Sequence, residues 1–162
     1  MAINYRMVYN WVVMDSPTLQ VGVKMLTIYE GKFLIMRRSD KVYSNVQGTM
    51  WDIPGGRIDP AFSLFENLKR EIVEEVGLEL TDIHWKKAAL LDAQDIWVSA
   101  KNLHVIRLTY VGKVEGQIAL SHEHDEYKLA SYEEMLELFN EETLIGQVLR
   151  AQKPQIERII RS

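Results

Sequence analysis

Three glutamates at helical spacing, Glu71, Glu74 and Glu75, follow closely on a pair of glycines, Gly55 and Gly56. On an α-helix these carboxylates fall within an arc of about 100°, where like charges repel one another. Clustered carboxylate oxygens suit Mg²⁺, which completes its shell with waters or substrate phosphates, and the glycines allow a backbone carbonyl to approach as a further ligand. The cluster therefore predicts a divalent-cation site that carries a phosphorylated ligand. A solvated acidic helix face is the alternative.

The segment that carries the glutamates has its own start and stop signals. Ser63 is a favourable N-cap, and Glu66 three residues later completes a capping box, whereas Gly77 suits the left-handed position that ends a helix. Between these positions an apolar stripe recurs at helical spacing; it consists of Phe65, Leu68, Ile72 and Val76. The pattern predicts a helix that buries one side and presents the three glutamates along its border.

The remaining elements are a mixture of strands and helices. The predicted strands are 21–28, 33–38, 85–98, 103–114 and 127–130, and the predicted loops are 39–50 and 115–126. Ser131 and Glu134 repeat the capping-box signature before another helix. The tail over 143–162 is predicted to be helical, with Pro154 as the first residue of a second helix. These elements indicate the α/β (α+β) class, with helices covering a mixed sheet.

The composition of the 162 residues is that of an ordinary globular protein, with 47% hydrophobic and 26% charged residues. The length favours a single domain over 1–162, with 1–20 as an N-terminal extension and 143–162 as a C-terminal helical tail. The net charge of −4, without a basic run, argues against a nucleic-acid partner. Because the sequence has no cysteine, disulfides, thiolate catalysis and cysteine zinc sites are excluded.

The sequence offers no targeting signal. No run approaches the roughly 20 apolar residues of a membrane-spanning helix, and the first residues lack the basic start and apolar core of a signal peptide. A cytoplasmic protein without a membrane partner is therefore expected. The stretch YRMVYNWVVM (5–14) is either an added strand or a homodimer contact, and the sequence does not choose between the two.

From Gly56 to Leu78 the sequence resembles the Nudix box, in which a glycine, five residues, a glutamate and seven residues precede R-E-U-x-E-E-x-G-U, where U is aliphatic. The run REIVEEVGL (70–78) matches the second half without a gap, and WDIPGG (51–56) resembles the segment that leads into the box. The resemblance extends over about residues 21–140. It implies a Nudix-like α/β/α sandwich with a mixed β-sheet.

Two positions depart from the box. Phe62 stands where the first glutamate belongs, and Ala61 stands where glycine is usual. In the family that glutamate pairs with the box arginine, which is Arg70 here. Glu66 lies four residues before Arg70, a favourable spacing for a helical ion pair. We therefore expect Glu66 to orient Arg70 in place of the missing glutamate and to hold the metal-site helix in register.

The resemblance also implies roles for individual residues. The expected metal ligands are Gly55 through its carbonyl, Glu71, Glu74, Glu75 and Glu123 from a later loop. Glu126 is the second choice for the loop ligand, because Leu129 stands where the alignment expects tryptophan. The catalytic set is Glu71, Glu74, Glu75, Arg70 and Glu123, with Glu75 as the most damaging single loss. Mg²⁺ is the expected cofactor, with Mn²⁺ as an alternative.

Further residues are candidates for substrate contacts. Arg37 and Arg38 end a predicted strand and either clamp a phosphate or form a solvent-facing basic pair; Arg38 is preferred for the clamp. The expected substrate-binding set is Arg38, Arg37, Gly56 and Glu126. His122 and His124 flank Glu123 and are expected to be exposed, with a base or ligand role as the alternative. Three aromatic residues are candidates for stacking on a base or for buried packing: Tyr43, Trp97 and Tyr127.

The reaction implied by the resemblance is attack of water on a phosphate of a nucleoside diphosphate linked to another group, catalysed by a hydrolase of phosphoric anhydride bonds. Signals typical of ADP-ribose and diadenosine polyphosphate enzymes are missing, since no proline lies between Pro60 and Pro154 and QDIW (94–97) replaces the expected tyrosine. Elimination favours a nucleoside triphosphate substrate, cleaved to the monophosphate and pyrophosphate. The alternatives are a nucleotide-sugar or ADP-ribose-type pyrophosphatase and a non-catalytic nucleotide-binding sensor.

Overall fold

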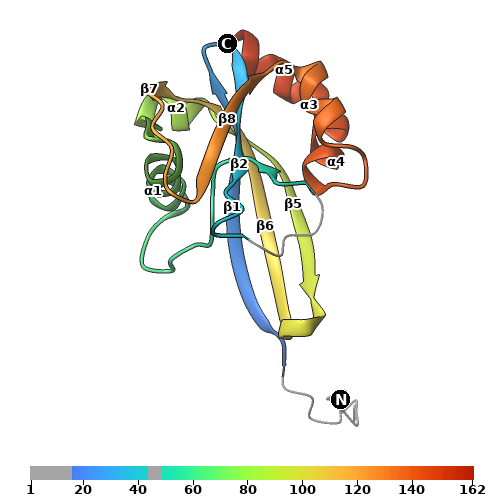
Figure 1. The fold of residues 1–162 in the computed structure, drawn as a ribbon. Helices are drawn as coiled ribbons and strands as arrows, with labels where there is room; N and C mark the ends of the chain where they lie inside the picture. The colour runs from blue at the N-terminus through green and yellow to red at the C-terminus, as the bar shows by residue number, and fades with distance from the viewer. Residues whose placement is uncertain (1–15, 44–48) are drawn as a thin grey trace, which may run out of the picture.

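The computed structural model describes residues 16–43 and 49–162 of the chain, and Figure 1 shows its path. The strands are β1 (Thr18–Tyr29), β2 (Lys32–Arg38), β3 (Trp51–Asp52), β4 (Leu78–Glu79), β5 (Ala89–Val98), β6 (Leu103–Lys113), β7 (Glu115–Gly116) and β8 (His124–Ala130). The helices are α1 (Leu64–Val76), α2 (Asp82–Lys87), α3 (Tyr132–Leu138), α4 (Leu144–Ala151) and α5 (Lys153–Arg161). Within the described residues, no helix combines the length and apolar character needed to cross a membrane.

The main sheet is mixed, as the sequence predicted. Its strand order is β3-β2-β1-β6-β5, and β8 also pairs with β2. β1 and β6 run parallel along almost their whole length, whereas the other pairs in this sheet are antiparallel. β4 and β7 form a separate antiparallel pair.

Helices cover both faces of this sheet. Because successive side chains of a strand point to opposite faces, β1 contributes to two apolar cores. Val23 and Met25 pack in one core with the predicted stripe of α1, and Leu26 and Ile28 pack in the other with α3, α4 and α5. In Figure 1, α1 and α2 accordingly lie on one side of the strands and the three C-terminal helices on the other. The α/β/α sandwich is confirmed.

The capping signals in the sequence are confirmed at two helices. Ser63 accepts a hydrogen bond from the backbone N–H of Glu66 at 3.2 Å, and the Glu66 carboxylate accepts one from the backbone N–H of Ser63 at 2.8 Å. Ser131 and Glu134 form the same box at the start of α3. Gly77 ends α1 with a φ of 70°, the left-handed conformation that its position predicted.

The predicted strand over 85–98 is wrong in its first residues. Residues 82–87 form α2, whose N-cap Thr81 accepts a hydrogen bond from the backbone N–H of His84, and β5 begins at Ala89. Trp85 packs with its ring centroid 5.4 Å from that of Phe65 and 5.0 Å from that of Tyr110. This tertiary packing outweighs the weak β preference of a short segment.

Three other predicted boundaries change. β1 begins at Thr18, so the last residues of the predicted extension over 1–20 belong to the sheet, whereas 1–15 and the stretch proposed as a strand or dimer contact lie outside the described residues. β8 begins at His124, inside the predicted loop over 115–126, and β7 lies at the start of that loop. Pro154 is the second residue of α5 and follows Lys153.

The 51–58 segment lies between β1 and β2 where these two strands diverge. β1 pairs with β2 only from Thr27 onward, and its residues before Thr27 do not pair with β2. Its backbone bonds instead to the 51–58 segment, through Met25 to Pro54 (3.0 Å), Val23 to Gly56 (2.9 Å) and Ile58 to Val21 (2.9 Å). The paired glycines are therefore held at the centre of the fold.

Gly55 is required in this segment by its backbone conformation. Its φ is 130°, and a Cβ added there would lie 2.1 Å from the carbonyl oxygen of Val23. Both features exclude any residue with a side chain, so the close approach of the segment to β1 depends on this glycine.

We expect Ser63→Ala to lower the free energy of unfolding by about 1 kcal/mol, because the first turn of α1 loses its cap. Urea denaturation measures the change. Ser131→Ala removes the matched cap of α3 and should cost a similar amount. A Ser63→Ala variant as stable as the wild type would contradict the assignment of the box.

Candidate active site

A hollow of about 250 Å³ lies between α1 and the loop that precedes β8. We call it the acidic hollow, and its lining residues are Glu71, Glu74, Glu75, Ser121, His122 and Glu123. The loop is tied to the end of α1 by backbone hydrogen bonds from Ala119 to the carbonyl of Val76 (2.9 Å) and from Ser121 to the carbonyl of Glu75 (3.0 Å). The structure therefore brings together the four glutamates that the sequence singled out, although Glu123 comes from a distant segment.

A second, larger hollow of about 420 Å³ adjoins the acidic hollow and shares Glu71, Glu75 and Glu123 with it. We call it the cationic cleft, because its other lining residues include Lys24, Arg38, Arg57 and Arg107. Gly55, Gly56, Tyr43 and Asp52 also line it. An acidic end thus opens directly into a cleft lined with positive charge.

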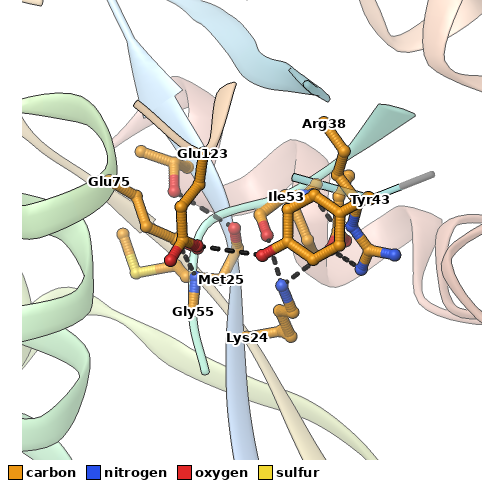
Figure 2. A network of polar contacts seen from close by, with 10 residues as sticks. Lys24, Met25, Arg38, Tyr43, Ile53, Gly55, Glu75 and Glu123 are labelled. Atoms are coloured by element: carbon orange, nitrogen blue, oxygen red, sulfur yellow. Dashed lines mark hydrogen bonds and ion pairs between the residues drawn. The ribbon is translucent and has the colours of Figure 1, made fainter. Parts of the chain in front are cut away.

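A buried carboxylate joins three strands at the centre of the cleft. Asp52 of β3 accepts hydrogen bonds from Lys24 of β1 at 2.8 Å and from Arg38 of β2 at 2.6 Å. Figure 2 shows Lys24 and Arg38 approaching this point from different strands. Burial alone would raise the pKa of Asp52, but attraction first by Lys24 and then by Arg38 outweighs it and lowers the pKa to about 2. Asp52 is therefore ionised at neutral pH.

Glu75 is a partly buried member of the acidic cluster that hydrogen-bonds to the glycine segment. Its Oε2 accepts a hydrogen bond from the backbone N–H of Gly55 at 2.7 Å, a contact visible in Figure 2. Burial raises the pKa of Glu75 to about 7, although Lys24 and the Gly55 N–H act in the opposite direction. In the described part of the chain no cation forms an ion pair with it, so this carboxylate lacks a positive partner.

The other two glutamates that α1 contributes to the acidic hollow are bound by the box arginine. Arg70 forms ion pairs with Glu71 at 2.7 Å and with Glu74 at 2.9 Å. The predicted pair between Glu66 and Arg70 is wrong, because both the backbone N–H and the hydroxyl of Ser63 donate to the Glu66 carboxylate. Phe62, at the position of the missing glutamate, is 50% exposed on the outer side of α1. Arg70 thus relieves the repulsion within the cluster without Glu66.

Glu123, the predicted loop ligand, lines both hollows, whereas Glu126, the second choice for that ligand, lines neither. Glu123 accepts a hydrogen bond from the Tyr43 hydroxyl at 2.9 Å. Burial raises the pKa of Tyr43, and its bond to Glu123 adds to this. Glu126 instead pairs with Arg37 at 3.2 Å, and Asp125 pairs with Arg37 at 2.8 Å.

The side chains of Arg37 and Arg38 lie on opposite faces of the sheet, because consecutive residues of a strand point in opposite directions. Arg38 lines the cationic cleft, as preferred, whereas Arg37 does not line either hollow. Strand alternation carries this distinction, and the sequence alone could not say which of the two faces the cleft.

The neighbouring histidines and aromatic residues take different positions. His124 is 6% exposed, so its predicted exposure is wrong, and burial lowers its pKa. His122 lines the acidic hollow. Of the aromatic candidates Tyr43 lines the cleft, while Trp97 stacks on His104 with ring centroids 3.8 Å apart. Tyr127 is 45% exposed and does not line the cleft.

Sequence reasoning missed Lys24, Asp52 and Arg107. Lys24 carried a usable signal, since it is a charge inside the apolar run VGVKMLTI (21–28). A lysine within a buried strand needs a buried acidic partner, and here the partner is Asp52. Arg107 carried no comparable signal, because its position in the cleft follows from the pairing of β1 with β6.

The donor atoms of the acidic hollow fit a hard divalent cation in kind, since carboxylate oxygens are the ligands that Mg²⁺ prefers. Among the described residues, however, no three acidic or histidine side chains converge closely enough to hold an ion in their present positions. Arg70 holds Glu71 and Glu74 through two of their oxygens. Because one oxygen of each carboxylate remains outside these bonds, cation binding requires the side chains to move closer together but leaves the Arg70 contacts possible.

The fold and the position of the glutamates define the class of protein. The NUDIX domain family matches residues 18–152, most of the chain, and the chain belongs to this family. By its family it is classed with the hydrolases that act on phosphoric anhydride bonds.

Solved structures share this fold. The MutT protein from Methanosarcina mazei Go1 is 27% identical, with 91% of this chain and 96% of that chain covered and a TM-score of 0.61. An Ap4A hydrolase from C. elegans is 20% identical (86% and 98% covered, TM-score 0.54). An ADP-ribose pyrophosphatase from Streptococcus suis is 17% identical (84% and 93% covered, TM-score 0.53). A comparison with curated proteins gave no match.

We expect Asp52 to make the free energy of unfolding depend on pH in the acid range. Because its pKa is 3.8 when unperturbed and about 2 in the fold, the unfolded state binds the proton first. The contribution of Asp52 to the free energy of unfolding is therefore fully present above about pH 4. It falls by about 2 kcal/mol as the pH drops to about 2. Urea denaturation at several pH values should show this loss in the wild type, and the Asp52→Asn variant should lack it.

Asp52→Asn should also be less stable than the wild type at neutral pH, because Lys24 and Arg38 lose their shared carboxylate. Asp40→Asn, which removes a mostly exposed carboxylate, serves as the control and should leave the pH curve unchanged. An Asp52→Asn curve parallel to that of the wild type between pH 2 and pH 4 would contradict the assignment.

Proposed function

We propose that the chain is a Mg²⁺-dependent pyrophosphohydrolase that cleaves a nucleoside triphosphate to the monophosphate and pyrophosphate. The observation that carries the proposal is the direct opening of the acidic hollow into the cationic cleft. The similarly folded Ap4A hydrolase and ADP-ribose pyrophosphatase act on nucleotide derivatives, which supports a nucleotide as the substrate class. A cleft of this size also lies within the range of small-molecule sites.

The positive charge of the cleft attracts the anionic phosphate chain of a nucleotide. Lys24 and Arg38 share the single charge of Asp52, so together with it they carry a net positive charge. Arg57 and Arg107 form no ion pair in the described part of the chain, and both line the same cleft. This surplus offsets the formal net charge of −4 of the whole chain, which by itself disfavours an anionic ligand.

The residues that would hold Mg²⁺ are Glu71, Glu74, Glu75, Glu123 and the carbonyl of Gly55. When bound, the metal supplies activation of water and neutralisation of charge on the leaving phosphate oxygen. Arg70 keeps Glu71 and Glu74 in place beforehand.

Glu75 accepts the proton of the attacking water. The water oxygen bonds to one phosphorus of the α–β linkage, the bridging P–O bond breaks, and the group on the other side of the bridging oxygen leaves with that electron pair, so that the products are the monophosphate and pyrophosphate. A carboxylate whose pKa is about 7 before the metal binds suits general-base catalysis near neutral pH.

One observation favours the non-catalytic sensor as the second candidate. The glutamates do not converge on a cation site in the described residues, and Arg70 already forms ion pairs with two of them. A nucleotide sensor would use the cationic cleft in the same way but would not need the metal. Turnover separates the two candidates, because only the enzyme releases products.

On a panel of nucleoside triphosphates, nucleotide sugars and dinucleotides, we expect the wild-type chain with Mg²⁺ to hydrolyse the triphosphates best and to release pyrophosphate from them. Chelation of the metal should abolish turnover. Chromatography of the products identifies the bond that is cleaved. Orthophosphate as the product, or nucleotide binding without turnover, would contradict the proposal, and the second result would favour the sensor.

Glu75→Gln should lower kcat by about 100-fold or more, since it removes the general base. Steady-state kinetics with the best substrate of the panel measures the loss. Glu79→Gln removes an equal charge from an exposed residue three positions beyond α1 and should leave kcat unchanged. Equal kcat values for the Glu75→Gln variant and the wild type would exclude Glu75 as the base.

Gly56→Ala should impair catalysis through Glu71 while the fold persists. A Cβ at Gly56 would lie 2.5 Å from Glu71 Oε2, and the flexible end of that side chain can move away. A displacement of this size should lower kcat by about 10-fold or more, with little change in the unfolding temperature. The loss should resemble that of Glu71→Gln, and an unchanged kcat would show that the position of Glu71 is not critical.

A further inference from the structure

Arg107 is a largely buried cation of the cleft that has no carboxylate partner among the described residues. Its Nε and Nη2 atoms both donate to the side-chain oxygen of Gln94, at 3.1 and 2.6 Å. The neighbouring Arg38 and Arg70 bind carboxylates instead. A guanidinium has five N–H donors, so most of those of Arg107 are available to a ligand in the cleft. Burial lowers the pKa of Arg107, although Asp52 and Asp92 oppose this.

Gln94 fixes the position of this guanidinium. The residue is 8% exposed on β5, and its amide nitrogen donates to the carbonyl of Leu144, at the start of α4, at 3.1 Å. Because the amide nitrogen is committed to that carbonyl, the amide oxygen must face Arg107. The helix layer therefore sets the direction of an arginine in the cleft through one buried amide.

The surface next to Arg107 is partly apolar. In the register of the sheet, Gly22 of β1 lies beside Arg107 of β6, which lies beside Gln94 of β5. Two residues further along, on the same face, the row is Gln20, Val105 and Ile96. Gly22 adds no side chain to this surface, and Val105 lines the cleft.

The N–H donors of Arg107 thus lie beside a floor to which Gly22 adds no side chain and Val105 adds an apolar one. A planar base with polar edges matches such a surface, whereas a phosphate would leave the apolar side chains without a partner.

We propose that Arg107, positioned by Gln94, binds hydrogen-bond acceptors on the edge of the substrate's base and thereby sets the base preference. The inference rests on the proposed function, since it names the part of a nucleotide that lies on this surface. An arginine fork binds two adjacent acceptors best, and a 6-oxopurine presents them at O6 and N7, whereas adenine presents one acceptor and one donor there. The wild type should therefore prefer GTP to ATP.

The test compares the kinetics of GTP, ATP and 7-deaza-GTP for the wild type and for Arg107→Gln. We expect Arg107→Gln to raise the KM for GTP by about 10-fold or more and to change the KM for ATP much less, with kcat nearly constant. 7-Deaza-GTP lacks one of the two acceptors, so the substitution should raise its KM less than it raises the KM for GTP. Arg158→Gln removes the same charge from an exposed position on α5 and should change neither KM.

Gln94→Leu tests the positioning role. The variant keeps Arg107 and its charge but removes the oxygen that directs it, so the ratio of the two KM values should move toward one while kcat stays close to that of the wild type. A purely structural role for Gln94 would lower stability and leave this ratio unchanged. Thermal unfolding of each variant separates these effects. If Arg107→Gln does not fold, Arg107→Lys keeps the charge without the fork and is judged by the same ratio.

Two results would overturn the inference alone. An unchanged KM ratio in Arg107→Gln would show that this residue does not discriminate between bases. Equal weakening of GTP, ATP and inorganic tripolyphosphate would place Arg107 at a phosphate instead. If the wild type hydrolyses no nucleotide, the proposed function fails, and calorimetric binding decides the inference: a preference for GTP that Arg107→Gln abolishes supports it, and absence of nucleotide binding overturns it as well.

Discussion

The ion pairs of Asp52 hold the charged centre of the site together, because they link side chains of β1 and β2 to a single carboxylate of β3. β1 and β2 diverge just where the 51–58 segment enters between them, and Lys24 and Arg38 reach the same carboxylate from either side. Burying three charges is costly unless each is paired, and here each cation has a short contact. The glycines of the segment, the cleft and the approach of α1 all depend on this arrangement.

The acidic cluster divides into two parts with different electrostatics. Glu71 and Glu74 share the single positive charge of Arg70, which offsets part of the repulsion between them. Glu75 has one backbone donor and forms no ion pair among the described residues, and its pKa is raised to about 7. One arginine thus stabilises two of the glutamates, while the third keeps a raised pKa.

Local signals in the sequence predicted much of this structure. The limits of α1 follow from Ser63 and Gly77, and the mixed sheet follows from alternating apolar runs. The resemblance to the Nudix box placed four glutamates correctly around one hollow. Contacts between distant segments could not be predicted in this way. The side chain of Glu66 is used by the cap and is lost to Arg70, and α2 forms because Trp85 packs between two other aromatic rings.

The hydrogen bonds between the loop before β8 and the end of α1 limit the insertions and deletions that this loop can accept. Surface loops usually tolerate insertions and deletions, but this one is anchored to α1 through Ala119 and Ser121, and Glu123 follows two residues after the second anchor. Between Ser121 and Glu123, an added or deleted residue would carry the carboxylate out of the hollow. Variation in chain length is therefore confined to other loops, and this short stretch is as restricted in length as a strand.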